Sequence, residues 1–118
     1  MDGKRRRVFG VLLGLALLTS AHANGSAVGT VTYFVPFTFN GVEGFVVRLT
    51  TMSTPAACST SNRFIMMNTD PKYKTTLAAV MGAHFSGSSI FIRGTGSCTQ
   101  YDNASEDLAY VCLGPDPC

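Results

Sequence analysis

The sequence lacks an apolar run long enough to cross a bilayer. Its apolar run Val8–Leu18 has about eleven residues, whereas a membrane-spanning helix needs about 20. The run follows four basic residues, Lys4–Arg7, and precedes Ala21-His22-Ala23, where small residues occupy the positions that signal peptidase requires. This pattern predicts a cleavable secretory signal over residues 1–23 and no stable membrane span. No cysteine follows the expected cut, so a lipid anchor would have no acceptor there.

Positive charge is scarce once the signal is set aside. The whole chain carries a formal net charge of +2, but residues 24–118 contain five basic and six acidic side chains. Phosphate binding needs a dense surface of lysine and arginine, so we expect no nucleic acid partner. Residues 24–118 are enough for one small domain with a single core, exported to the periplasm or the extracellular space.

The sequence also lacks a C-x-x-C pair, the usual element of a structural zinc site. An even number of cysteines in a small exported domain is typical of a disulfide framework, and four cysteines allow three pairings. We favour Cys58–Cys98, which closes a loop of about 40 residues, and Cys112–Cys118, which would fasten the C-terminal tail. Zinc is the competing interpretation. We expect neither a metal nor another cofactor.

Groups suited to catalysis are few. His84 is the single histidine after residue 23, and no serine, histidine and acid combine into a nucleophilic site. We interpret His84 as a packing or capping residue near a helix C-terminus. A hydrolase would need two carboxylates across a cleft, but Glu106 and Asp107 are adjacent in a polar loop, where we expect them to be solvated. The protein is therefore predicted not to be an enzyme, with a hydrolase as a third hypothesis.

The sequence is rich in alternating apolar residues. The odd positions of Val31–Phe39 are apolar, which predicts a strand with one buried face. Pro36 lies inside this strand and predicts a bulge, a bend or an edge position. Asn40-Gly41 has turn chemistry, and alternation resumes over residues 45–49. The first two strands should therefore form a hairpin.

The rest of the chain contains one helix and three more strands. Asp70 and Pro71 are typical of a helix start, and apolar residues then recur at three-to-four spacing up to Gly87, where the helix should end. Polar loops are expected over residues 50–62 and 97–107. Three apolar segments predict strands: Arg63–Asn68, Ile90–Arg93 and Leu108–Leu113. A short buried helix would explain the first of these segments equally well.

The order of three strands, one helix and two strands predicts a mainly β, OB-fold-like barrel of five strands. In this fold the helix plugs one end of the barrel, while the face of strands 2 and 3 and the loops 1–2 and 4–5 commonly bind ligands. Closure also removes exposed sheet edges. An open five-stranded sheet packed against one helix is the alternative.

Two aromatic residues, Phe34 and Tyr101, fall outside the main inward pattern and are candidate binding residues. Loops rich in serine, threonine and asparagine would supply hydrogen bonds of the kind that sugars use. The partner would then be a glycan or a protein ligand. The competing interpretation packs Phe34 under a loop and Tyr101 on a disulfide.

Short motifs add a family resemblance. They are Gly29-Thr30-Val31-Thr32 on the first strand, Cys58 before the third, Leu77-Ala78-Ala79 on the helix, Ser97-Cys98 after the fourth, and Cys112-Leu113-Gly114-Pro115-Asp116 at the end. In these motifs, in cysteine placement and in element order, the chain resembles the OB-fold B subunits of pentameric bacterial toxins, of the subtilase-cytotoxin B subunit type, and their periplasmic relatives. The resemblance spans nearly the whole mature chain.

The resemblance implies a non-enzymatic subunit that forms a homo-pentamer and binds sialylated glycans, with its helices lining a pore for a catalytic partner. One position departs from the family. The toxin subunits carry a sugar-contacting serine just before the first-strand glycine, where this chain has Val28, and the nearby Ser26 is displaced but remains a candidate binding residue. Two hypotheses result: a secreted or periplasmic binding module resembling a toxin B subunit, or a small envelope protein with a structural or inhibitory role toward another protein.

Overall fold

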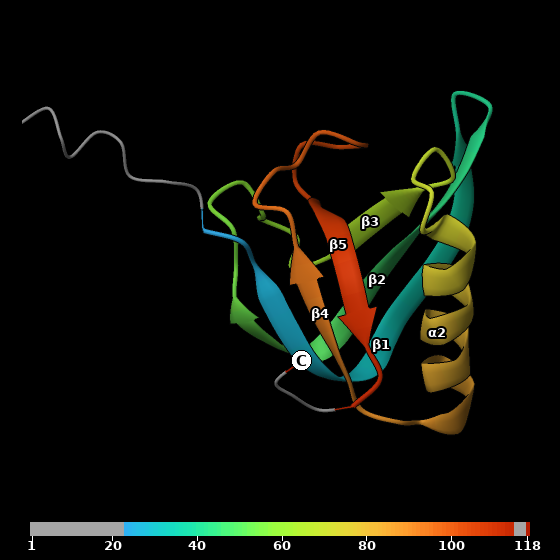
Figure 1. Ribbon diagram of the computed structural model, residues 1–118. Helices are drawn as coiled ribbons and strands as arrows, with labels where there is room; N and C mark the ends of the chain where they lie inside the picture. The colour runs from blue at the N-terminus through green and yellow to red at the C-terminus, as the bar shows by residue number, and fades with distance from the viewer. Residues whose placement is uncertain (1–22, 115–117) are drawn as a thin grey trace, which may run out of the picture.

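Apolar alternation produces five strands that close on themselves around one core (Figure 1). The computed structural model describes residues 23–114 and 118, so the predicted signal lies outside the described residues except for Ala23. In chain order the elements are β1 (Ser26–Phe39), β2 (Val42–Thr54), β3 (Phe64–Met67), α2 (Tyr73–Ser86), β4 (Ile90–Gly94) and β5 (Glu106–Cys112). The strands form a closed barrel in the order β1-β2-β3-β5-β4. The predicted mainly β, OB-fold-like barrel is confirmed, and the open sheet is wrong.

The barrel closes at the beginning of β1. Residues 26–29 pair with β4 on one side, while β1 pairs with β2 along its length on the other. The remaining contacts join β2 to β3, β3 to β5 in parallel, and β5 to β4. This double pairing explains why β1 starts five residues before the predicted Val31 and why β2 continues through Thr54 into the predicted loop. Both extensions depend on partners that local alternation does not reveal.

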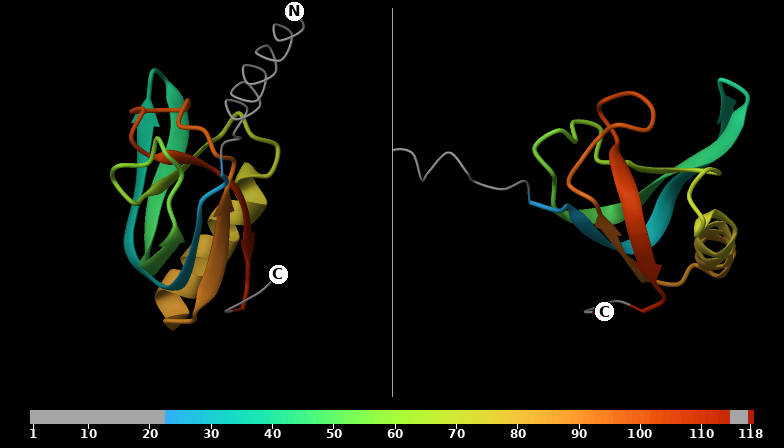
Figure 2. Two further views of the ribbon diagram at one scale, coloured as in Figure 1. Left: turned by 90° about the vertical axis from the view of Figure 1, so that its left-hand side faces the viewer. Right: turned by 45° about the horizontal axis from the view of Figure 1, so that its top comes forward.

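The β1–β2 hairpin turns at Asn40-Gly41, as predicted, and both residues have positive φ angles of 52° and 79°. The hairpin projects beyond the other strands of the barrel (Figure 2). Pro36 pairs in regular register with Phe45, and this part of β1 has β2 as its strand partner, with no described pairing to β4. Of the three alternatives for Pro36, the edge position is therefore the observed one.

A shift of register inside β1 overturns the prediction of one buried face. The pairing with β2 is irregular between Val28 and Val31 and again between Val31 and Tyr33. Because side chains alternate between faces, such irregularities exchange the inner and outer sets of residues. Val31 and Phe34 pack against the main core, whereas Tyr33 and Phe37 pack on the other face of the sheet. The odd positions thus lie on two faces.

The main core lies between the barrel and α2. Its fully buried members come from every layer: Phe45, Val47, Phe64, Val80, Ile90 and Ile92. A smaller cluster of Val46, Ile65 and Met67 lies on the outer face of β2 and β3. No helix within the described residues is sufficiently long and apolar to span a membrane.

Helix α2 ends at the predicted glycine, but its start and its buried face differ from the prediction. Gly87 adopts a left-handed conformation with φ 70°, and its N–H donates to the carbonyl of Ala83, as expected for a helix end. The helix begins at Tyr73, after a turn in which Asp70 accepts a hydrogen bond from the Lys72 N–H at 2.8 Å. The start at Pro71 is therefore wrong by two residues.

The buried face of the helix also differs from the predicted one. Tyr73 and Val80 are buried, as three-to-four spacing predicts, and Thr76 and Ala83 are buried with them, whereas Met81 and His84, which continue that spacing, are exposed. Leu77 is partly buried and packs against the same core.

Both disulfides have the favoured pairing. Cys58–Cys98 joins the loop after β2 to the loop after β4, with 6.0 Å between Cα atoms, and Cys112–Cys118 joins the end of β5 to the C-terminal residue. None of the four cysteines is free. Their sulfur atoms are therefore bonded to one another and not held as zinc ligands.

Two helix glycines should respond to alanine in opposite directions. A Cβ at Gly82, inside α2, would meet no atom within 4 Å, whereas Gly87 has φ +70°. Gly82→Ala should raise the free energy of unfolding by about 0.5–1 kcal/mol through helix propensity, and Gly87→Ala should lower it by about 1 kcal/mol through backbone strain. Urea unfolding of both variants tests this pair, and a destabilised Gly82→Ala would contradict the described surroundings of α2.

Candidate functional site

The three predicted binding residues lie in three different places. Ser26 is buried, with 8% of its surface exposed, and pairs with both β2 and β4. Phe34 is half-buried beside the core, 5.8 Å from Phe45 and 6.0 Å from His84 between ring centroids. Tyr101 lies in the loop after β4 and is 39% exposed. Of these predicted residues, Tyr101 is the one in an accessible cluster.

Tyr101 completes a group of three aromatic rings, named here the aromatic patch: Phe37, Phe39 and Tyr101. The Tyr101 ring lies 4.9 Å from the ring of Phe37 and 5.1 Å, edge-on, from that of Phe39. Phe39 is 39% exposed, as is Tyr101. Tyr101 therefore packs on the β1 strand of the hairpin. The rings lie on the hairpin and on loop 4–5, where OB-folds commonly bind ligands.

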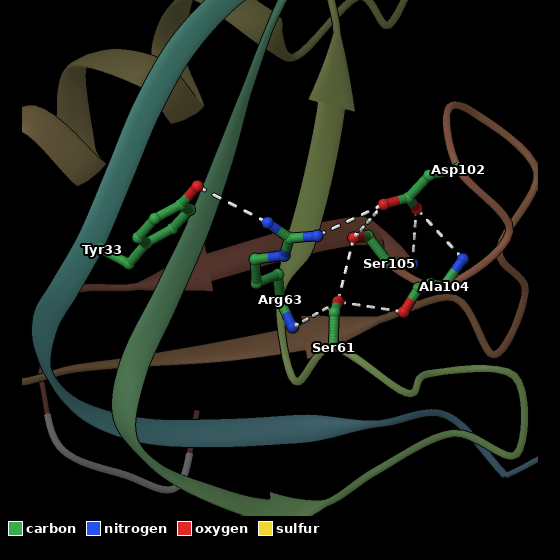
Figure 3. A network of polar contacts seen from close by, with 6 residues as sticks. All are labelled: Tyr33, Ser61, Arg63, Asp102, Ala104 and Ser105. Atoms are coloured by element: carbon green, nitrogen blue, oxygen red, sulfur yellow. Dashed lines mark hydrogen bonds and ion pairs between the residues drawn. The ribbon is translucent and has the colours of Figure 1, made fainter.

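A second group adjoins the patch along β1, named here the arginine cluster: Tyr33, Arg48 and Arg63. The two guanidinium groups lie 5.2 and 5.6 Å from the centroid of the Tyr33 ring, within the range of cation–π contact. Arg63 donates a hydrogen bond to the Tyr33 hydroxyl at 3.5 Å and forms an ion pair with Asp102 at 3.4 Å (Figure 3). Arg48 is exposed, and no ion pair within the described residues involves it.

Asp102 fixes the loop that carries Tyr101. Its Oδ1 accepts backbone N–H bonds from Ala104 and Ser105 at 3.0 and 2.9 Å, and its Oδ2 accepts the Ser105 hydroxyl at 3.3 Å. Burial opposes the charged form, but these hydrogen bonds, together with Arg63, outweigh it and lower the pKa of Asp102 below its ordinary value. The carboxylate thus acts as an ionised anchor between the loop and the arginine cluster.

Ser61 attaches the same loop to the chain that leads into β3. The Ser61 hydroxyl donates to the Ala104 carbonyl at 3.0 Å, lies 3.0 Å from the Ser105 hydroxyl and accepts the Arg63 N–H at 3.2 Å. Figure 3 shows this network on the side of Arg63 that faces away from Tyr33. A loop held by such contacts presents Tyr101 in one place, which lowers the entropy cost of binding.

Glu106 and Asp107 are buried, and the prediction of a solvated loop is wrong. They are 0% and 7% exposed and form the first residues of β5. Asp107 accepts the Thr99 and Gln100 N–H groups at 3.1 Å and the Thr99 hydroxyl at 2.7 Å. Backbone N–H groups therefore satisfy hydrogen bonds of both carboxyl groups in the interior.

Most of the patch and cluster was missed by sequence reasoning. Phe37 and Phe39 were assigned to the buried face, and the two arginines were not singled out. Alternation was the available signal, and the irregular register of β1 made it misleading.

Little else in the described structure offers reactive groups. His84 is exposed and packs beside Phe34 and Phe85, with 5.4 Å between the His84 and Phe85 ring centroids. Among the residues that the structure describes, no three His, Cys, Asp or Glu side chains are grouped so that they could hold a metal ion. The patch and cluster offer stacking faces, hydroxyls and guanidinium donors, which suit binding.

A separate apolar groove lies beside the helix. Its volume is about 390 Å³, and it runs between α2 and the end of β5, with Ala78, Ala79, Gly82, Ile90 and Leu113 among its lining residues. Leu113 is 71% exposed, and Phe85 of α2 is 77% exposed. Exposed apolar surface of this kind is a candidate for protein contacts.

Comparison of the chain with known proteins identifies no relative: no protein-family model, curated protein or solved structure matches it.

Removing the charge of Asp102 should cost stability in a pH-dependent way. Its lowered pKa means that the ionised side chain contributes fully above the unfolded value of about 3.9 and that the contribution is lost as the pH falls through the lower folded value. We expect Asp102→Asn to reduce the free energy of unfolding by about 1 kcal/mol at pH 7, with a smaller difference as the pH falls below the unfolded pKa. Urea unfolding of both proteins across this range measures it. A difference that does not vary with pH would mean that the charge has no role.

Proposed function

We propose that the protein is an exported, non-catalytic binding module that recognises a glycan through the aromatic patch. The observation that carries this proposal is the contact of Tyr101 with Phe37 and Phe39, which places three rings beside two guanidinium groups. Ring faces accommodate the apolar faces of sugars, while the Tyr33 hydroxyl and the arginines supply polar groups that fix orientation. The position on the hairpin and loop 4–5 supports a ligand-binding role.

Export is supported by two independent features. Residues 1–23 have the signal pattern, and the two disulfides are compatible with an oxidising compartment. We place the mature protein in the periplasm or outside the cell.

The resemblance to toxin B subunits supports the glycan and adds a homo-pentamer to the proposal. The family's sugar-contacting serine has no equivalent here, since Val28 replaces it and Ser26 is buried. We therefore assign the sugar to the aromatic patch and not to the start of β1. The apolar groove, which Leu113 lines, and the exposed ring of Phe85 would form contacts between copies of the chain.

A structural or inhibitory envelope protein is the second candidate. The same groove favours it, because Phe85 and Leu113 could equally insert into a different protein. In that case the aromatic patch would have no sugar ligand.

Tyr101→Ala should weaken glycan binding, and Tyr110→Ala provides a matched control. Both tyrosines are 39% exposed, but Tyr110 lies on β5, away from the patch. A glycan array with the mature protein would identify a ligand, and titration calorimetry would then compare the variants. We expect at least about a tenfold loss of affinity for Tyr101→Ala, equivalent to 1.4 kcal/mol, and little change for Tyr110→Ala. Equal affinities for the two variants would contradict the assignment of the patch.

The mass of the oxidised mature chain separates the two candidates. Light scattering at micromolar concentration should give about five chains for the toxin-like module. Leu113→Asp should then lower the mass, because it places a charge in the apolar groove. A monomer or dimer of the unchanged chain would contradict the ring and favour the envelope protein.

A further inference from the structure

Glu106 is a carboxylate in the interior without a cationic partner among the described residues. Its side chain is 0% exposed, and it takes part in no described ion pair. Oε2 accepts the N–H groups of Gly25 and Gly96, each at 2.8 Å, whereas Oε1 is buried and has no hydrogen-bond partner within residues 23–114 and 118. Burying an ionised carboxylate is costly unless an opposite charge compensates it. Oε1 is therefore a place where a positive group would stabilise the fold.

Glycines form a close enclosure around this carboxylate. A Cβ at Gly25 or at Gly94 would overlap the Glu106 carboxyl group. The Gly25 carbonyl also accepts the Gly94 N–H at 2.8 Å. Gly25 directly precedes the residues of β1 that pair with β4, so Glu106 lies where the barrel closes.

The predicted signal cut falls beside this carboxylate. Removal of residues 1–23 makes Asn24 the first residue, and Asn24 precedes the glycine whose N–H already bonds to Glu106. Consecutive Cα atoms are about 3.8 Å apart, so the new α-amino group would begin within one residue of the carboxylate. Asn24 is exposed, so a charged group there can keep part of its hydration.

We propose that signal removal supplies the counter-ion of Glu106: the α-ammonium group of Asn24 pairs with the buried carboxylate at Oε1. This inference rests on the proposed export and on a cut after Ala23. Before the cut, the same nitrogen belongs to an uncharged peptide bond, so the pair forms only in the mature chain. The mature barrel is thereby more stable than the unprocessed one at its point of closure.

The test displaces the α-ammonium group and measures whether the effect on stability depends on the charge of Glu106. The full chain is expressed with its signal in an exporting host, with and without a Gly-Ser insertion between Ala23 and Asn24. The insertion displaces the mature α-ammonium by about 7 Å along an extended chain. Both forms are also made with Glu106→Gln, which keeps the shape of the side chain and removes its charge. N-terminal sequencing of the exported proteins establishes the cut.

The insertion should lower the melting temperature by about 5 °C in the Glu106 background and leave it unchanged in the Glu106→Gln background. No decrease with Glu106, or the same decrease in both backgrounds, would overturn the proposal. A first residue other than Asn24 in the exported native protein would also overturn the proposal, because the proposal requires a cut after Ala23. The glycan titration is a separate measurement, so failure of the binding proposal is distinguishable from failure of this one.

A second measurement covers the case in which Glu106→Gln does not fold. The α-amine of the exported native protein is acylated in buffer and in urea, and the modified N-terminal peptide is quantified. Pairing predicts about a tenfold slower reaction in the folded protein, which corresponds to about 1.4 kcal/mol of preference for the ammonium form. Equal rates would overturn the proposal.

Discussion

Closure of the barrel at the first residues of β1 is the constraint on which the rest of the structure depends. Residues 26–29 pair with β4 while the same strand pairs with β2, so all five strands share one continuous sheet. A chain this short gains little from an open sheet with exposed edges, and closure buries the core that α2 then covers. The carboxyl group of Glu106 bonds on both sides of this junction, to Gly25 and Gly96.

The irregular register of β1 connects this closure to the candidate site. Ala27 and Val31 pack against the main core, whereas the irregularities place Tyr33 and Phe37 on the other face of the sheet. Loop 4–5 then packs on these residues and adds Tyr101. Asp102, Asp107 and the Cys58–Cys98 disulfide hold the loop, so a structural irregularity and an anchored loop together produce the aromatic patch.

The polar residues of this protein have mainly positioning roles. Asp102 and Asp107 both accept backbone N–H bonds within loop 4–5, and Arg63 connects Asp102 to Tyr33. Such a framework favours a fixed binding surface of aromatic rings and guanidinium groups, which agrees with the proposed recognition of a sugar. Leu113 lines the separate apolar groove, so the proposed glycan binding and the proposed contacts between chains would use different surfaces.

The sequence by itself determined the features that depend on neighbouring residues. The Asn40-Gly41 turn needs positive φ angles, Gly87 ends the helix for the same reason, and the apolar segments predict the order of three strands, one helix and two strands. The favoured disulfide pairing was also predicted, although spacing alone left three possibilities. These signals are local, because turn and cap geometry is set within a few residues.

Only the tertiary structure decided which side chains share a surface. Phe34 was a predicted binding residue and packs beside the core, and Glu106 was expected in solvent and is fully buried. Tyr101 was identified, but its partners on β1 lie more than 60 residues earlier in the chain. Register shifts, and backbone N–H groups brought from distant strands, determine these outcomes. Neither feature leaves a periodic pattern in a single sequence. Both are stabilised by contacts between distant residues, and these contacts exist only after the barrel has closed.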